Sequence, residues 1–442
     1  MRFLHTVGRF SRALAALSLA GGGAAAFAQS EQRACFVANN GNLEGSVTSF
    51  VFDAGNVPVL VDRVITGVDP DPGTNPYGIT LSPGGRWLAT SHTTISSTFE
   101  QITLIEVSPD ATLRIAGEFQ TDDSPLDLQW INDEYLAVTR TSLSVQNQVI
   151  VYRFDGADPN APTLSEVDRE NTGRFTGYMA VHPNRQIIYT ADSTDNWIRA
   201  FAVAADGTLT LLQTMPTGGT FPLGIDVSPD GTKLYGGGGI SNSGNKVVGY
   251  LLAGDGTLTQ MAGSPFISPG ASPKLARFSP DSSILYVAHG TDATVRSFLI
   301  DSESGALTST GFSFDVGLQG SHGDHVTLDE MLLITDDTTA IDGIRGLYSF
   351  DRLADGDFTM NGAIVDTQGV GPTEIAGWTP PPCVGDFDGD KTVGLSDLAV
   401  MLGAFGTCSG DPGYVAAADL DGSGCVDLVD LSTLLGVFGS TC

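Results

Sequence analysis

Carboxylates crowd two stretches near the C-terminus of the chain, at a spacing that suits a cation. Residues 386–397 read DFDGDKTVGLSD, and residues 419–430, which begin 33 positions later (419 minus 386), read DLDGSGCVDLVD. In both stretches, oxygen-bearing residues recur at positions one, three, five and twelve. This spacing lets a twelve-residue loop wrap a hard cation that needs about six to eight oxygen ligands. We therefore expect two calcium ions, one in each loop.

The expected ligands follow from the loop positions. The first loop would use Asp386, Asp388, Asp390, the backbone carbonyl of Thr392 and Asp397, with a water at Gly394. The second loop would use Asp419, Asp421, Ser423, the backbone carbonyl of Cys425, Asp427 and Asp430. The alternative is a solvated pair of acidic loops without a cation. That alternative does not explain why oxygen-bearing residues occur at the same positions in both twelve-residue loops.

Apolar residues follow position twelve of each loop at helix-face spacing. The two matching stripes are Leu398, Met401, Leu402 and Phe405, and Leu431, Leu434, Leu435 and Phe438. Neither helix could bury such a stripe alone. Two helices packed against each other could, provided that calcium neutralises the carboxylates that otherwise repel.

A second polar cluster lies in GSHGDHVTLDE, residues 320–330. Strand alternation puts His322 and Asp324 on one face and His325 on the other. A histidine and carboxylate pair could bind a metal or serve as acid and base. We favour hydrogen bonds to loop backbones instead, because no third ligand is identifiable. The histidines that end strands or begin turns are interpreted as structural: His92, His182 and His289.

The middle of the chain is built from one recurring phrase. Residues 223–238 (LGIDVSPDGTKLYGGG) and 274–289 (KLARFSPDSSILYVAH) each combine an alternating run, a turn and a second run rich in β-formers. This pattern predicts an antiparallel hairpin. A third and a fourth alternating run follow each hairpin. A repeat of about 46 to 53 residues with four strands is typical of β-propeller blades.

Seven such units can be counted by their second strands, at Cys35, Leu88, Leu136, Ile188, Leu234, Leu285 and Leu332. We predict an all-β, seven-bladed β-propeller of four-stranded blades over residues 29–378, followed by a small α-helical domain. Residues 34–39 form a second strand without a first, and residues 372–378 form a first strand without a second. Closing the ring requires these two to pair. Cys383 would then lie near enough to Cys35 for a disulfide, in competition with a bridge from Cys383 to Cys408.

Composition and targeting restrict the class of partner. The chain has 442 residues, of which 51 are acidic and 21 basic, which argues against nucleic acid because phosphate binding needs clustered Lys and Arg. Residues 1–28 combine three arginines, an apolar run and an Ala-Phe-Ala cleavage pattern, which predicts a signal peptide and export. No later segment reaches the roughly 18 apolar residues of a membrane span. An oxidising compartment would favour disulfides among the five cysteines.

The phrase LYVAH...VRSFLID..SGALT...SP resembles the seven-bladed propellers of the lactonase type, which include 6-phosphogluconolactonase-like and muconate-lactonising enzymes. In catalytic members the resemblance implies a Pro-Arg-His cluster on a first strand and a Glu after a second strand, at the mouth of the central channel. This chain has Gly177 and Tyr178 at the Arg and His positions, and Ser193 after Asp192 at the Glu position. The catalytic set is therefore not carried over.

Residues 385–442 resemble a type I dockerin, because two calcium loops of EF-hand type with Asp at position twelve occur at the end of an exported chain. The resemblance implies cohesin binding through hydroxyl residues at positions ten and eleven and a basic pair on the helix. The residues at these positions are Leu395, Ser396, Leu428 and Val429, with Leu402 and Gly403 in place of the basic pair. We expect an unidentified extracellular or cell-surface protein as the partner rather than a cohesin.

The sequence thus predicts a signal peptide (1–28), a propeller (29–378), a Pro-rich linker (379–384) and a dockerin-like module (385–442). The favoured function is a secreted binding or scaffold protein that is tethered through the calcium-stabilised module. The alternative is an extracellular lactonase-like hydrolase that acts on a sugar-derived or lactone substrate at the channel mouth, through His322 and Asp324.

Overall fold

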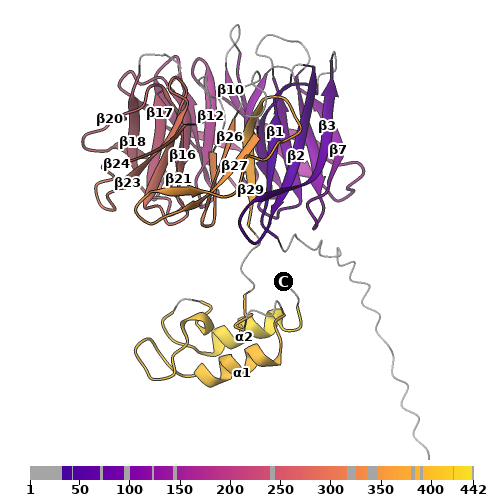
Figure 1. Cartoon of the computed structure of the whole chain (residues 1–442), viewed down its shortest axis with the longest axis vertical. Coiled ribbons are helices and arrows are strands. Elements are labelled where there is room, and N and C mark those ends of the chain that lie inside the picture. Colours follow the sequence, from indigo (N-terminus) through magenta and orange to yellow (C-terminus); the bar gives the residue numbers. More distant parts are fainter. Residues whose placement is uncertain are drawn as a thin grey trace, which may run out of the picture.

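The computed structural model describes residues 32–41, 43–69, 73–93, 100–121, 124–142, 147–238, 244–315, 325–336, 346–379, 384–388, 392–421 and 423–440. These residues form a ring of β-sheets and a small helical unit (Figure 1). Neither α-helix in these ranges is long and apolar enough to cross a membrane. The predicted signal peptide lies outside the described residues.

The described strands form seven sheets, and every sheet is antiparallel with its first strand innermost. Three sheets of the first half are β4 (Pro76–Leu81), β5 (Trp87–His92), β6 (Gln101–Val107) and β7 (Leu113–Gln120); β8 (Pro125–Trp130), β9 (Tyr135–Arg140), β10 (Gln148–Asp155) and β11 (Thr163–Asn171); and β12 (Thr176–Val181), β13 (Ile187–Asp192), β14 (Trp197–Val203) and β15 (Leu209–Pro216).

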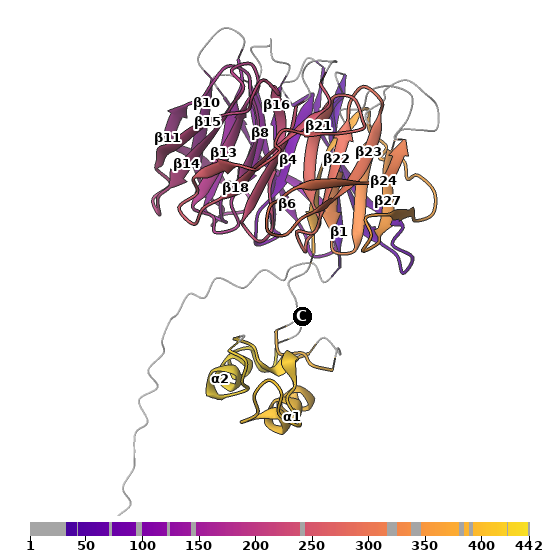
Figure 2. The same ribbon diagram turned by 90° about the vertical axis from the view of Figure 1, so that its left-hand side faces the viewer.

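Three sheets of the second half follow the same order, except that the first of them has an extra short strand, which pairs with its third strand. They are β16 (Pro222–Val227), β17 (Lys233–Gly238), β18 (Lys246–Leu252), β19 (Leu258–Gln260) and β20 (Phe266–Ile267); β21 (Pro273–Phe278), β22 (Ile284–His289), β23 (Thr294–Ile300) and β24 (Leu307–Asp315); and β25 (His325–Leu328), β26 (Met331–Asp336), β27 (Gly346–Arg352) and β28 (Phe358–Met360). Figure 2 shows the inner strands β4, β8 and β16 near the middle of the ring and β11 at its edge.

The seventh sheet closes the ring from both ends of the propeller. It contains β29 (Pro372–Trp378), β1 (Ala34–Asn39), β2 (Glu44–Phe52) and β3 (Pro58–Val68), in that order. Ala34 pairs with Trp378 and Val37 with Ile375 in an antiparallel register. The predicted pairing of residues 34–39 with 372–378 is confirmed, and so is the seven-bladed fold.

The turn between first and second strands has a physical basis in the Ser-Pro-Asp-Gly phrase. In the fifth unit, the Asp230 carboxylate accepts hydrogen bonds from Ser228 Oγ at 2.6 Å and from Thr232 N at 2.9 Å. Gly231 has φ +71°, a left-handed conformation that costs glycine little. The phrase therefore terminates one strand and aligns the next.

Apolar side chains of neighbouring sheets pack against each other around the ring. Between the closing sheet and the sheet of β25–β28, Cys35, Val37 and Phe50 contact Met331 and Leu333, and all five are buried. Cys35 has a free thiol in this cluster, and burial raises the pKa of that thiol. The proposed Cys35–Cys383 bridge is therefore wrong, because the Cys35 side chain points between two sheets.

The C-terminal unit contains α1 (Leu395–Ala404), a 3₁₀ turn (Ala416–Ala418) and α2 (Leu428–Val437). Its core includes the buried side chains of Met401 and Leu434. The prediction that packing buries both full stripes is wrong in part. Leu398 and Leu431 are half-buried, whereas the side chains one turn away on each helix stay exposed: Leu402, Phe405, Leu435 and Phe438.

A disulfide joins Cys408 to Cys425 within this unit. The alternative bridge from Cys383 to Cys408 is therefore wrong, because Cys408 is already paired. Cys383 and Cys442 lie outside the described residues.

Candidate functional site

A cavity of about 360 Å³ occupies part of the central channel of the propeller. Residues of all seven innermost strands line it, together with Arg185 and Pro229 from the turns that follow β12 and β16. The cavity therefore lies near the end of the channel where the innermost strands end. Its volume is within the usual range for small-molecule sites, roughly 300–1,000 Å³.

Bulky side chains from four blades meet across the channel on the side where the inner strands begin. Tyr178 and Leu275 are buried in one cluster, with Tyr77 and Leu223 packed against them. The Tyr178 hydroxyl is hydrogen-bonded with Tyr77 and Glu374, and burial, together with the Glu374 charge, raises the pKa of Tyr178 well above its usual value. Tyr178 thus brings this cluster into contact with Glu374 at the channel.

Glu374 brings a buried carboxylate to the wall of the cavity. Its side chain is 4% exposed, and Oε2 accepts a hydrogen bond from Ile79 N of the neighbouring blade at 3.3 Å. Asp226 is held in a similar way, since Oδ2 accepts from Phe278 N at 3.2 Å and Oδ1 from Val227 N at 2.9 Å. Each carboxylate thus has an orientation that is fixed by a neighbouring first strand.

Polar groups of opposite charge share this wall. Arg277 lines the cavity, as do Gln129, Thr80 and Thr327. Carboxylates and a guanidinium around one small cavity are the groups that a general-base hydrolysis uses, because one takes a proton from water and the other stabilises an oxyanion. Glu374, Asp226 and Arg277 were not among the residues predicted from the sequence. Asp226 and Arg277 are both the fifth residue of their first strands, and that shared position was the signal that could have indicated them; Glu374, the third residue of β29, had no such signal.

The residues that the sequence suggested for catalysis do not line this cavity within the part of the chain that the structure describes. His322 and Asp324 lie outside the described residues. Gly177 leaves no room for a side chain without displacing a neighbour, because a Cβ there would lie 3.2 Å from Leu223. Ser193 Oγ donates to the carbonyl oxygen of Pro222. These last two residues stabilise contacts between blades.

Asp192, next to Ser193, takes part in a buried ion pair. One of its carboxylate oxygens lies 2.9 Å from Arg199 Nη1, and the other accepts from Thr176 Oγ1 at 2.9 Å. Burial raises the pKa of Asp192 to about 6, despite the opposing effect of Arg199.

The three histidines interpreted as structural are held by hydrogen bonds. His92 contacts Thr74 O and Thr103 Oγ1, and His182 Nε2 lies 3.0 Å from Gly231 O. His289 Nε2 lies 2.6 Å from Ser268 Oγ, and burial lowers the pKa of His289 to about 4. These contacts tie strand ends to loops.

The first C-terminal loop gathers three of its predicted ligands. Asp386, Asp388 and Asp397 each place a carboxylate oxygen within 4.8 Å of the other two. Asp397 is buried, and hydrogen bonds from Gly394 N, at 2.7 Å, and Phe387 N, at 2.6 Å, lower the pKa of its carboxyl. Thr392 is half-buried at position seven, and Asp390 lies outside the described residues.

The second loop repeats this arrangement with Asp419, Asp421 and Asp430. Burial opposes ionisation of Asp430, but hydrogen bonds from Asp427, Asp421 and Leu420 N outweigh it and lower the pKa of the carboxyl. Gly424 stands at position six with φ +88°, where the loop turns sharply.

The remaining predicted ligands of the second loop make local contacts. Ser423 Oγ donates to Cys425 O at 3.1 Å, and Asp427 Oδ1 caps α2 by accepting from Val429 N at 2.8 Å. The donor set of carboxylate, hydroxyl and carbonyl oxygens fits a hard cation such as calcium.

The ring of four-stranded sheets and its channel define a seven-bladed β-propeller. A family model described as Lactonase, 7-bladed beta-propeller matches residues 143–245. Among solved structures, the periplasmic gluconolactonase PpgL from Pseudomonas aeruginosa is similar, with a TM-score of 0.61 and 18% identity over 79% of this chain and 99% of that one.

Two further structures share the fold. A candidate 6-phosphogluconolactonase from Bacteroides uniformis has a TM-score of 0.61 and 16% identity, over 78% of this chain and 99% of that one. A functionally unknown protein from Desulfotomaculum acetoxidans has a TM-score of 0.60 and 17% identity, over 79% and 99%. No curated protein matches the chain. At these identities the likeness concerns the fold.

Proposed function

We propose that the propeller is a lactonase-like hydrolase that opens a sugar-derived lactone or ester in the cavity of its central channel. The observation that carries this proposal is the buried Glu374 carboxylate on the wall of a cavity lined by all seven blades. The likeness to lactonase-type propellers favours this function over the scaffold that the sequence analysis preferred.

The cavity residues suit a hydrolysis in two stages. Glu374 takes a proton from water as the water oxygen bonds to the lactone carbonyl carbon, and Arg277 stabilises the resulting oxyanion. The carbon to ring-oxygen bond then breaks, and the ring oxygen receives the proton back from Glu374. Asp226 accepts hydrogen bonds from substrate hydroxyl groups. The products are a hydroxy acid and the unchanged carboxylate.

A titration of released acid at constant pH, with a panel of sugar lactones, tests this proposal. We expect Glu374→Gln to lower kcat by about 10²-fold or more, because a positioned base contributes roughly 10²–10⁴. The matched control is Glu303→Gln, which changes an exposed glutamate in a turn. Equal rates for both variants, or no lactone hydrolysis by the unaltered protein, would overturn the proposal.

A non-catalytic binding propeller is the second candidate. Gly177, Tyr178 and Ser193 favour it, since they replace the family's catalytic residues and make only internal contacts among the described residues. Saturable binding of a lactone without turnover would support this function and contradict the first.

We also propose that the C-terminal unit binds two calcium ions. The predicted ligands are Asp386, Asp388, Asp390, Thr392 and Asp397 in the first loop, and Asp419, Asp421, Ser423, Cys425, Asp427 and Asp430 in the second. Two carboxylate clusters at equivalent positions support this proposal. Calorimetry on the full chain should give two equivalents of calcium, and Asp397→Asn should leave one. Absence of binding heat would contradict it.

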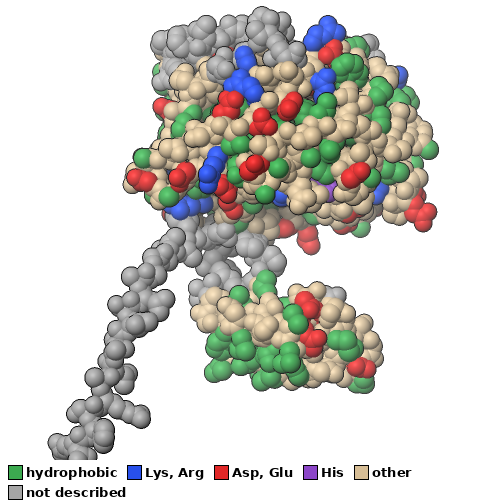
Figure 3. All heavy atoms as spheres, turned by 180° about the vertical axis from the view of Figure 1, so that it is seen from behind, with side chains coloured by type: hydrophobic (Ala, Val, Ile, Leu, Met, Phe, Trp, Pro, Cys, Tyr) green, Lys and Arg blue, Asp and Glu red, His purple; other side chains and the backbone are tan. Residues whose placement is uncertain are grey.

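The unit would attach the propeller to another protein outside the cell. Both helices expose apolar residues at equivalent positions, and Figure 3 shows hydrophobic side chains grouped on one face of the unit. The exposed apolar residues at equivalent positions are Leu395, Leu402 and Phe405 on one repeat, and Leu428, Leu435 and Phe438 on the other. A contiguous exposed apolar surface on a soluble protein is typical of a protein contact. An uncharged partner surface would fit it.

A further inference from the structure

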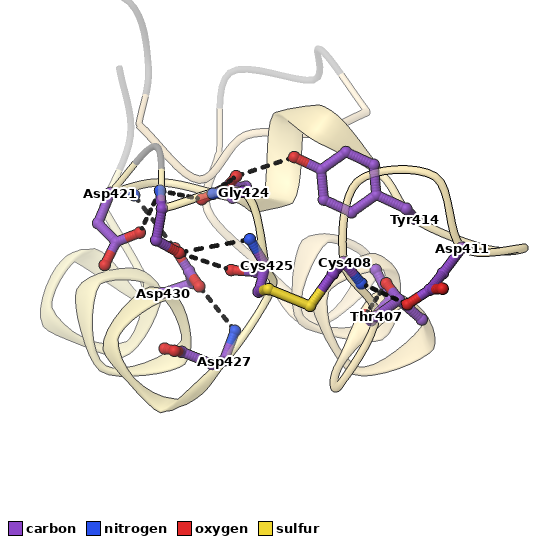
Figure 4. Close-up of a disulfide and its surroundings, with 12 residues drawn as sticks. Thr407, Cys408, Asp411, Tyr414, Asp421, Gly424, Cys425, Asp427 and Asp430 are labelled. Atoms are coloured by element: carbon purple, nitrogen blue, oxygen red, sulfur yellow. Dashed lines mark hydrogen bonds between the residues drawn. A yellow bond between two sulfur atoms is a disulfide. The ribbon is translucent and has the colours of Figure 1, made fainter.

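The Cys408–Cys425 disulfide ties the segment after α1 to the second loop (Figure 4). Cys425 is position seven of that loop, the residue whose carbonyl oxygen is a predicted ligand. Backbone hydrogen bonds continue the contact on both sides, from Val426 N to Thr407 O at 2.8 Å and from Ser409 N to Gly424 O at 2.7 Å. The disulfide therefore fixes the backbone of the loop at a ligand position.

The first repeat has the same backbone contact without the disulfide. Val393 N donates to Ser440 O at 3.0 Å, and Gly439 N donates to Val393 O at 2.8 Å. Val393 lies 33 residues before Val426, and Ser440 and Gly439 lie 33 residues after Thr407 and Gly406. The contacts in the two repeats are therefore equivalent. In the sequence, Thr392 and Thr441 stand where Cys425 and Cys408 would be. The described parts of the two loops are thus alike in backbone pairing, but only the second has a disulfide at position seven, where the first has Thr392.

A tyrosine adds a second restraint to the second loop. Tyr414 Oη donates to Asp419 Oδ2 at 2.8 Å, and Gly424 N donates to the same oxygen at 2.8 Å. Residue 381, at the equivalent place in the first repeat, is a proline and offers no hydroxyl group. Position one of the second loop is therefore held before any ion arrives.

We propose that the disulfide pre-organises the second loop, so that it is the tighter of the two calcium sites while the disulfide is intact. This inference rests on the proposed calcium binding. An ordered loop binds with less loss of conformational entropy than a mobile one. Reduction by a dithiol, which gives up two electrons and two protons and becomes a cyclic disulfide, frees two thiols and removes the restraint. The redox state thereby regulates the calcium affinity of one site.

Calcium titrations of the full chain, with chelator-buffered free calcium, test this proposal. Asp397→Asn isolates the second site and Asp430→Asn isolates the first. In the Asp397→Asn background, adding Cys408→Ser and Cys425→Ser should weaken the affinity by about tenfold or more, as expected when loop order is lost. In the Asp430→Asn background, the same two changes should leave the affinity unaltered.

Far-UV circular dichroism at saturating calcium checks that the variants fold. Reduction of the Asp397→Asn variant with a dithiol breaks the same disulfide without a mutation and should weaken calcium binding in the same way. Equal affinities with and without the disulfide at the second site would overturn the proposal, as would equal losses at both sites. A lack of calcium binding by the unaltered, oxidised chain would instead refute the calcium sites themselves, so the two failures are distinct.

Discussion

Two buried groups of the propeller, His289 and Asp192, should titrate in the same acidic range with opposite effects on stability. Burial is the main cause for both, and it favours the neutral form of each group. It lowers the pKa of His289 to about 4 and raises the pKa of Asp192 to about 6. The charged neighbours that oppose burial are Asp292 for His289 and Arg199 for Asp192.

The sign for His289 follows from its lowered pKa. An unfolded histidine titrates near 6.5, so the unfolded chain binds the proton first as the pH falls. The stability from neutral His289 is fully present above pH 6.5 and is lost as the pH falls through 4. A shift from 6.5 to about 4 corresponds to a loss of about 3 kcal/mol.

The sign for Asp192 is the reverse. Its folded pKa of about 6 lies above the unfolded value of 3.8, so the folded chain binds the proton first. Its contribution is fully present below pH 3.8 and is lost as the pH rises through 6, again by about 3 kcal/mol. Between pH 6.5 and 4 the two effects therefore nearly cancel in the unaltered protein.

Urea unfolding at several pH values between 7 and 4, followed by tryptophan fluorescence, measures this balance. All four tryptophans lie between residues 87 and 378, so the signal reports the propeller. We expect His289→Gln to gain stability on acidification and Asp192→Asn to lose it, each by about 3 kcal/mol relative to the unaltered protein. Parallel pH profiles for all three proteins would refute the argument, and so would slopes of the same sign.

Three further perturbations test packing and buried hydrogen bonds. Trp378→Ala, which empties a buried position in the closing strand, should lower the unfolding free energy by about 3–5 kcal/mol in the same urea assay. Met401→Ala or Leu434→Ala should destabilise the helical unit by about 2–5 kcal/mol, whereas the exposed Leu402→Ala should change it by less than about 0.5 kcal/mol, as measured by helix circular dichroism on heating. Glu106→Gln weakens hydrogen bonds from two arginines and should cost about 1–3 kcal/mol, measured by urea unfolding.

Most of the propeller could be predicted from the sequence because each blade repeats a local signal. Alternation between residues 223 and 238 places a turn at Ser228 to Gly231, and the hydrogen bonds of Asp230 enforce it. The orphan strands at residues 34–39 and 372–378 also predicted the closure, since an unpaired edge needs a partner.

The channel chemistry could not be predicted in the same way. Glu374 and Asp226 lie in ordinary strand phrases, and only the ring brings them to one cavity with Arg277. The disulfide was also missed. Cys408 and Cys425 become neighbours because Thr407 pairs with Val426, a contact between two repeats that neither repeat indicates alone. The spacing of apolar residues correctly predicted that Met401 and Leu434 lie in the core. It did not predict that Phe405 and Phe438 are exposed, because the spacing gives the direction of the buried face of a helix but not its width.

The pairing of β29 with β1 sets the order of events during biosynthesis. Thr373 Oγ1 donates to Ala38 O across 335 residues of sequence. A growing chain cannot complete its first blade until residue 378 has emerged from the ribosome, and contacts of such separation form slowly. The nascent propeller therefore stays open throughout its synthesis. The strand pairing that stabilises the finished ring therefore also delays its closure until almost the whole propeller sequence has been made.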